Sequence, residues 1–131
     1  MNQLDEHGLK TGRWEEPDPH GGVVTSSYIA DERQGKWVHK FADGRVRSEF
    51  NYDTGKLTGE CSWYRVTGGL MQKGTFLNDQ KHGLWQRWTA AGDLLDEGHF
   101  DRGIKIGEWV VYNPDGSVKK RSSHRSRPET R

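Results

Sequence analysis

The chain contains few apolar residues, few prolines and almost no cysteine. Of its 131 residues 31% are apolar, four are proline and one is cysteine. A single cysteine excludes an internal disulfide, and the low apolar content excludes a thick two-layer core of the ordinary kind. No apolar run reaches the roughly 18 residues of a membrane-spanning helix. The N-terminus, Met1 to Glu6, lacks the basic start and apolar stretch of a signal peptide, so we expect a cytoplasmic protein.

Motifs of catalysis and metal binding are also missing. The sequence has no Walker loop, nucleophile elbow or HExxH. Its six histidines share no common place in the repeat described below. His82 and His99 can approach one another across neighbouring strands, but we interpret the histidines as solvated residues and not as metal ligands. We interpret Cys61, beside Trp63, as a small packing residue. These absences predict a protein that is not an enzyme and holds no metal or cofactor.

What the chain does contain is a strict repeat marked by glycines. Gly35, Gly59, Gly83 and Gly107 stand 24 residues apart, and a second series keeps the same step at Gly44, Gly68, Gly92 and Gly116. Two residues after each leading glycine comes Trp37, Cys61, Trp85 or Trp109. An earlier copy is one residue shorter and includes Gly12 and Trp14. The chain is therefore an array of about five units of 23–24 residues.

Each unit is predicted to be a β-hairpin. Turn signals fall every ten to fourteen residues, which leaves no room for helices, and the strongest is Asn113-Pro114-Asp115-Gly116, typical of a type I turn followed by a bulge. The runs between turns are rich in aromatic and β-branched residues. Because an isolated hairpin is only marginally stable, the units must pair edge to edge. The prediction is an all-β fold with a single elongated, curved antiparallel sheet, a meander of hairpins over residues 1–118.

The spacing also predicts which side chains share a face. Position five of each unit should pair with position eleven, so that Tyr64 faces Leu70, Trp88 faces Leu94 and Tyr112 faces Val118. We expect this face, with Phe76 and Phe100, to be the core. Trp14, Trp37, Trp85 and Trp109 differ in parity and are expected to form an exposed stripe on the other face. Twist or bulges in the strands could exchange the two faces. This stripe is the candidate partner-binding site.

Charge separates along the chain. Residues 119–131 carry six Lys or Arg against Glu129 alone, whereas residues 1–118 carry fourteen against eighteen acids. With no apolar residue after Val118, the basic segment 119–131 is predicted to be a disordered tail. The acidic body argues against nucleic acid as a partner, and it leaves contact with an anionic membrane to the tail alone.

Two units carry a resemblance to a known family. Residues 83–94, Gly-Leu-Trp-Gln-Arg-Trp-Thr-Ala-Ala-Gly-Asp-Leu, and residues 107–118, Gly-Glu-Trp-Val-Val-Tyr-Asn-Pro-Asp-Gly-Ser-Val, resemble MORN repeats. They are most similar to the bacterial variant associated with toxin-antitoxin and immunity systems. The resemblance covers most of residues 8–118 and implies a curved sheet that binds other molecules. It supplies no catalytic residues.

Two functions follow from these observations. The first is an immunity or antitoxin protein, in which the sheet binds a cognate bacterial toxin and neutralises it through the tryptophan stripe. The alternative is a membrane-lipid-binding or scaffold module.

Overall fold

The computed structural model describes residues 2–124. These residues form 14 strands and no helix. The strands are β1 (Gln3–Leu4), β2 (Lys10–Pro17), β3 (Val23–Ile29), β4 (Glu32–Arg33), β5 (Gly35–Lys40), β6 (Val46–Asp53), β7 (Lys56–Leu57), β8 (Gly59–Tyr64), β9 (Leu70–Leu77), β10 (Gln80–Lys81), β11 (Gly83–Trp88), β12 (Leu94–Asp101), β13 (Ile104–Tyr112) and β14 (Val118–His124). Because these residues contain no helix, none offers a helical membrane span.

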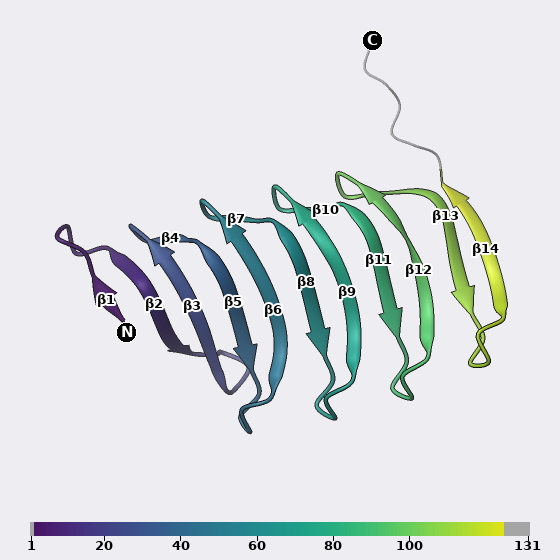
Figure 1. The fold of residues 1–131 in the computed structure, drawn as a ribbon, viewed down its shortest axis with the longest axis horizontal. Helices are drawn as coiled ribbons and strands as arrows, with labels where there is room; N and C mark the ends of the chain where they lie inside the picture. The colour runs from purple at the N-terminus through teal and green to yellow at the C-terminus, as the bar shows by residue number, and fades with distance from the viewer. Residues whose placement is uncertain (1, 125–131) are drawn as a thin grey trace, which may run out of the picture.

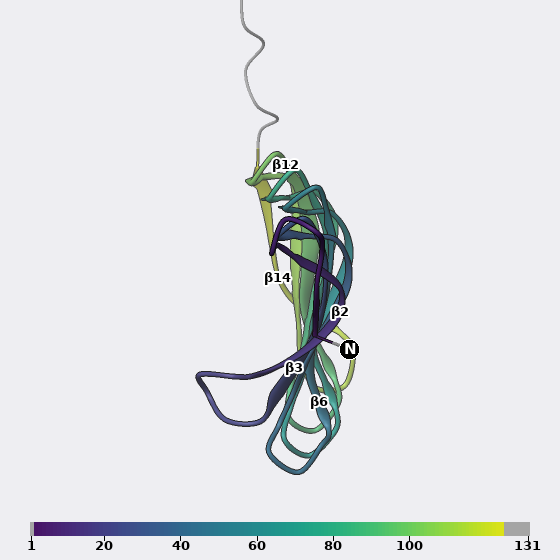
Figure 2. The same cartoon turned by 90° about the vertical axis from the view of Figure 1, so that its left-hand side faces the viewer.

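All the strands belong to one antiparallel sheet. Its main path runs β1, β2, β3, β5, β6, β8, β9, β11, β12, β13 and β14, and the short strands β4, β7 and β10 extend the hairpins of β3, β6 and β9. Consecutive strands therefore lie side by side, with β1 and β14 at opposite ends of a long ribbon (Figure 1). Viewed along its length, the sheet is one curved layer (Figure 2). The predicted fold class is confirmed.

The hairpin turns at one end of the units follow the predicted geometry. Gly44, Gly68, Gly92 and Gly116 have φ between 89° and 98°, in the left-handed region. In the last of these turns the backbone N–H of Gly116 donates to the carbonyl of Asn113 at 2.9 Å. The carbonyl of Ser117 then accepts from the N–H of Asn113 at 2.8 Å. The expected pairs Tyr64↔Leu70, Trp88↔Leu94 and Tyr112↔Val118 are all present.

A one-residue bulge follows each of these turns in β6, β9, β12 and β14. In β11 and β12, Arg87 pairs with Asp96 while Trp88 pairs with Leu94, so Leu95 has no partner across the ladder. The extra residue inverts the alternation of side chains between Leu94 and Phe100. Phe76 and Phe100 consequently lie on the face of Trp85, opposite to Trp88. The prediction that placed Phe76 and Phe100 with Trp88 is therefore wrong, whereas the predicted separation of Trp85 from Trp88 is confirmed.

The predicted boundary at residue 118 also needs correction. Val118–His124 is strand β14, paired with β13 from Tyr112↔Val118 to Gly107↔His124. Residues 119–124 are thus part of the sheet, because backbone pairing requires no buried apolar side chain. An ion pair between Arg121 of β14 and Glu108 of β13 crosses this ladder. Residues 125–131 of the predicted tail lie outside the described residues.

Candidate binding face

One face of the sheet carries a row of aromatic rings, whose contacts form two series that run from Trp14 to Tyr52 and from Phe50 to Trp109. We call it the tryptophan face; it is the side on which Trp37, Trp85, Trp109, Phe76 and Phe100 project. The rings meet mostly edge to face, at centroid separations of 5.2–6.1 Å, in the contacts Trp14–Tyr28, Tyr28–Trp37, Trp37–Tyr52, Phe50–Trp63, Trp63–Trp85, Phe76–Trp85, Trp85–Phe100 and Phe100–Trp109. Such contacts stabilise each unit against the next.

The four candidate tryptophans belong to this row, and they are not an exposed stripe. Trp85 is 2% exposed and Trp37 is 6% exposed, while Trp14 and Trp109 are partly buried. The indole N–H of Trp37 donates to the carbonyl of Ser27 at 3.0 Å, and that of Trp85 donates to Thr75 at 3.0 Å. The tryptophans are therefore the core of a single-layer sheet.

The burial of Trp85 and Trp109 depends on a glycine in the preceding unit. A Cβ added at Gly74 would lie 2.1 Å from the ring of Trp85, and one added at Gly98 would lie 2.3 Å from the ring of Trp109. The unit that has Cys61 in place of tryptophan shows the reverse arrangement. Continuing the ladder Ser48↔Trp63 and Glu49↔Ser62 places Phe50 opposite Cys61. Here the large ring, Phe50, is on the earlier strand and the small residue, Cys61, is on the later one, whereas in the Gly74–Trp85 pair the small residue is on the earlier strand.

Cations lie over the tryptophans, a feature that the sequence analysis missed. Lys10 Nζ is 4.9 Å from the Trp14 ring centroid, Lys81 Nζ is 4.7 Å from that of Trp85, and Lys105 Nζ is 4.4 Å from that of Trp109. The Arg33 guanidinium lies 5.2 Å from the Trp37 centroid. Each cation precedes its leading glycine by two residues, so the signal was present in the sequence. In the third unit this place holds Leu57, and the tryptophan is replaced as well.

The backbone holds these cations in place. Ala30–Asp31, Thr54–Gly55, Asn78–Asp79 and Arg102–Gly103 are two-residue turns in which both residues have positive φ, as in type I′ hairpins. The N–H of Asp31 donates to the carbonyl of Lys10 at 2.9 Å, and that of Gly103 donates to Lys81 at 2.8 Å. Three of these turns therefore fix the backbone of a cation in the preceding unit, namely Lys10, Arg33 and Lys81, whereas the Asn78–Asp79 turn binds the carbonyl of Leu57.

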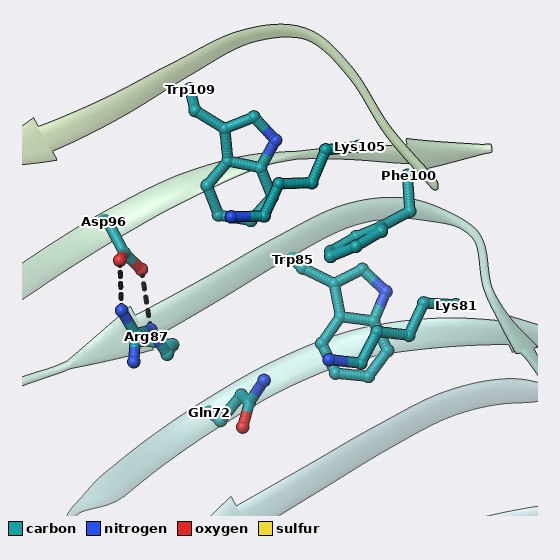
Figure 3. Close-up of a pocket in the computed structure, with 8 residues that line it drawn as sticks. All are labelled: Gln72, Lys81, Trp85, Arg87, Asp96, Phe100, Lys105 and Trp109. Carbon is teal, nitrogen blue, oxygen red and sulfur yellow. Dashed lines mark hydrogen bonds and ion pairs between the residues drawn. The ribbon is translucent and has the colours of Figure 1, made fainter. Parts of the chain in front are cut away.

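A shallow hollow of about 310 Å³ lies on the tryptophan face at its C-terminal half. Its floor is Trp85, Phe100 and Trp109, and the ammonium groups of Lys81 and Lys105 project over these rings (Figure 3). At its side Arg87 Nε donates to Asp96 Oδ1 at 3.0 Å, and a second guanidinium nitrogen binds Oδ2. The hydrogen bond to Asp96 raises the pKa of Arg87. The hollow thus combines an aromatic floor with three cations and one carboxylate.

A buried polar cluster lies near the N-terminal end of the same sheet. The side chain of Asp18 is 1% exposed, and its carboxylate accepts hydrogen bonds from the backbone N–H of His20 at 2.9 Å and from Arg47. His39 Nδ1 lies 3.1 Å from Asp18 Oδ2. The hydrogen bond from His20 outweighs burial and, with His39 and Arg47, lowers the pKa of Asp18. The cluster ties the β2–β3 hairpin to β5 and β6.

The remaining candidate residues form no reactive group. Cys61 is 2% exposed, and burial raises the pKa of its thiol to about 12. His82 lies 3.8 Å from Asp101. Within residues 2–124 no three His, Cys, Asp or Glu side chains gather closely enough to hold a metal ion.

The opposite face carries a hydrogen-bonded polar group on β11, β12 and β13. Gln86 donates to Glu97 at 3.0 Å, and the hydroxyl of Tyr112 donates to the same carboxylate, which raises the pKa of Tyr112. Lys73 is exposed on this face and pairs along the backbone with Ser62 and Gln86.

The comparisons leave the family of the chain open. No protein-family model matches it, and no curated protein is similar enough to match.

Proposed function

We propose that this chain is a binding protein without catalytic activity, of the immunity or antitoxin type, and that it neutralises a bacterial toxin by docking it on the tryptophan face. The observation that carries the proposal is the hollow between Lys81 and Lys105. There, cations and aromatic ring edges lie together on a sheet face that no other described element covers. The similarity of the repeats to bacterial MORN units supports the same proposal.

The chemistry of this face suits a protein partner. Interfaces between proteins are enriched in aromatic residues and arginine and gain most of their energy from a few central side chains. Here the rings are fixed by their neighbours, so little conformational entropy is lost on binding. In this proposal the contact residues are the cations and the partly buried Trp109, while Trp85, which is 2% exposed, lies beneath them. The buried body of each tryptophan supports the surface.

The proposal is tested by co-expression with the toxin encoded beside the gene. Growth of cells that produce the toxin should be restored by the full chain, and the two purified proteins should form a complex in isothermal titration calorimetry. Loss of both effects in a Trp109→Ala variant that urea unfolding shows to be folded, but not in Trp88→Ala on the opposite face, would locate the interface. Toxin that neither binds the chain nor is neutralised by it would contradict the proposal.

A membrane-binding role is the second candidate. It is favoured by the position of Arg33, Lys81 and Lys105, which form no ion pair among the described residues and lie on the same face as the rings. Cations near aromatic side chains are attracted to anionic headgroups. Cosedimentation with vesicles containing phosphatidylserine, but not with phosphatidylcholine vesicles alone, is the result that this role requires.

A further inference from the structure

We propose that the hollow between Lys81 and Lys105 is a carboxylate-binding site that receives an acidic segment of the partner protein. The inference rests on the proposed function and adds the chemistry of the partner. It is drawn from the balance of charge in the hollow, from the fixed position of its lysines and from the distance between them.

The positive charge of the hollow is only partly compensated. Its one carboxylate, Asp96, has both oxygens bound by Arg87. Lys81 and Lys105 have no ion-pair partner within residues 2–124, and their contacts are with the rings of Trp85, Phe100 and Trp109. Two ammonium groups are therefore available to an incoming anion. The electrostatic complement of this surface is acidic.

The two lysines are held ready for binding. Lys81 Nζ lies 4.7 Å from the Trp85 centroid and 5.2 Å from that of Phe100. The carbonyl of Lys81 is fixed by the N–H of Gly103. A lysine already restrained over a ring loses less rotamer entropy when it binds than a free surface lysine does. In Figure 3 the ammonium groups of Lys81 and Lys105 lie over the indoles of Trp85 and Trp109.

The spacing of the lysines selects a chain over a single small anion. Lys81 and Lys105 occupy equivalent places in consecutive units, which are two strands apart. Neighbouring strands are about 4.8 Å apart, so the two places are separated by about 10 Å. Two sites on alternate strands suit a polypeptide with several carboxylates, which contacts both cations at once. The hollow is also open to solvent along the sheet, which leaves room for an extended segment.

The repeat itself distinguishes this site from a general surface charge. Four units combine a cation with tryptophan, and the third unit lacks both, with Leu57 and Cys61 in their places. The cation also has a structural role, because an exposed cation–π contact contributes about 0.5–1 kcal/mol to the stability of the fold. The two roles differ in what a charge change does, because a structural cation affects stability and a binding cation affects affinity for anions.

The test uses the full chain and a synthetic peptide that alternates Glu and Thr, with the Gln–Thr peptide as its uncharged control. On titration, the indole N–H resonances of Trp85 and Trp109 should shift, and that of Trp88 on the opposite face should not. The Gln–Thr peptide should cause no shift. Binding should weaken strongly between ionic strengths of about 0.02 M and 0.5 M, because exposed charges are screened. Equal shifts at all three indoles, or none with the acidic peptide, would overturn the proposal.

Charge variants complete the test. The double variant Lys81→Glu/Lys105→Glu should bind the acidic peptide about tenfold more weakly or worse, whereas Lys73→Glu, the same change on the opposite face, should bind as the native chain does. Urea unfolding of each variant separates loss of binding from loss of fold, and Lys81→Gln/Lys105→Gln provides a milder change. Unchanged peptide affinity in folded variants would overturn the inference.

The outcome is separable from that of the proposed function. If the toxin binds the native chain and both double variants equally, the acidic site is wrong and the immunity role stands. If the acidic peptide binds as expected and the toxin does not, the site stands and the immunity role fails. Binding of phosphatidylserine vesicles that is lost in the variants, without binding of the peptide, assigns the surface to lipid and overturns the protein-segment inference.

Discussion

Gly74 lies directly beneath the indole of Trp85, so close that a Cβ there would lie 2.1 Å from the ring. We therefore expect Gly74→Ala to destabilise the protein by about 1–3 kcal/mol, as overpacking of a fixed ring does. Gly69→Ala is the matched control, because nothing lies within 4 Å of its added Cβ and its φ is not in the left-handed region. Urea unfolding measures both. Equal unfolding midpoints for the two variants would show that Trp85 can move away from the added Cβ without loss of stability.

The exchanged pair Phe50 and Cys61 predicts a rescue experiment. Cys61→Trp should destabilise the chain, because the new indole meets the ring of Phe50 on the adjacent strand. Adding Phe50→Gly should restore part of the lost stability by recreating the arrangement of Gly74 and Trp85. The coupling free energy from a double-mutant cycle checks this. A coupling near zero would mean that the two residues do not compete for the same space.

The Asp18 cluster predicts a dependence of stability on pH. The folded-state pKa of Asp18 is lowered from its usual 3.8, so its contribution is complete above that value and is lost as the pH falls through the lower folded-state pKa. Asp18→Asn should cost about 1–3 kcal/mol at pH 7, and less as the medium becomes more acidic than about pH 4. Urea titrations of both proteins across this range test the sign. A difference that grows in acid would contradict it.

Cys61 is expected to be inert in the folded protein. Burial raises the pKa of its thiol to about 12, so very little thiolate exists at neutral or mildly alkaline pH, and its sulfur is out of contact with solvent. A chromogenic disulfide reagent should therefore react with the native protein only as fast as it unfolds, and at once in urea. Rapid stoichiometric reaction of the folded chain would show that the middle unit opens locally.

The repeat made most of the fold predictable. The spacing of Gly44, Gly68, Gly92 and Gly116 located the bulged turns, and the pairs such as Trp88↔Leu94 followed from the turn type. Local backbone chemistry determines these features, so a single sequence is enough to predict them. The turns and the pairs beside them can therefore be predicted without knowledge of the tertiary packing.

The assignment of faces failed because of one residue per hairpin. Counting by twos from Leu94 to Phe100 ignores the unpaired Leu95, and a single added residue moves every later side chain to the other face. The bulged turn was itself predicted, but its effect on parity was not carried along the strand. Gly74 and Gly98 could have revealed the error, since a glycine in mid-strand indicates a ring packed against it.

The cations of the candidate site were also visible in the sequence. Lys81 and Lys105 keep the same place two residues before the leading glycine, but the sequence analysis counted only the positions after each glycine. Their position over Trp85 and Trp109 depends on strand twist and on side-chain direction, which the spacing does not specify.

The middle unit, with Leu57 and Cys61, divides the row of cations into two areas carried by the same stiff sheet. A ligand long enough to reach both would be held bivalently, and the second contact would form at a high effective concentration once the first was made. Removing one of the two areas would then weaken binding of such a ligand by more than the affinity of that area alone predicts. Deleting the middle unit would bring the two areas closer and change the length of ligand that can bridge them.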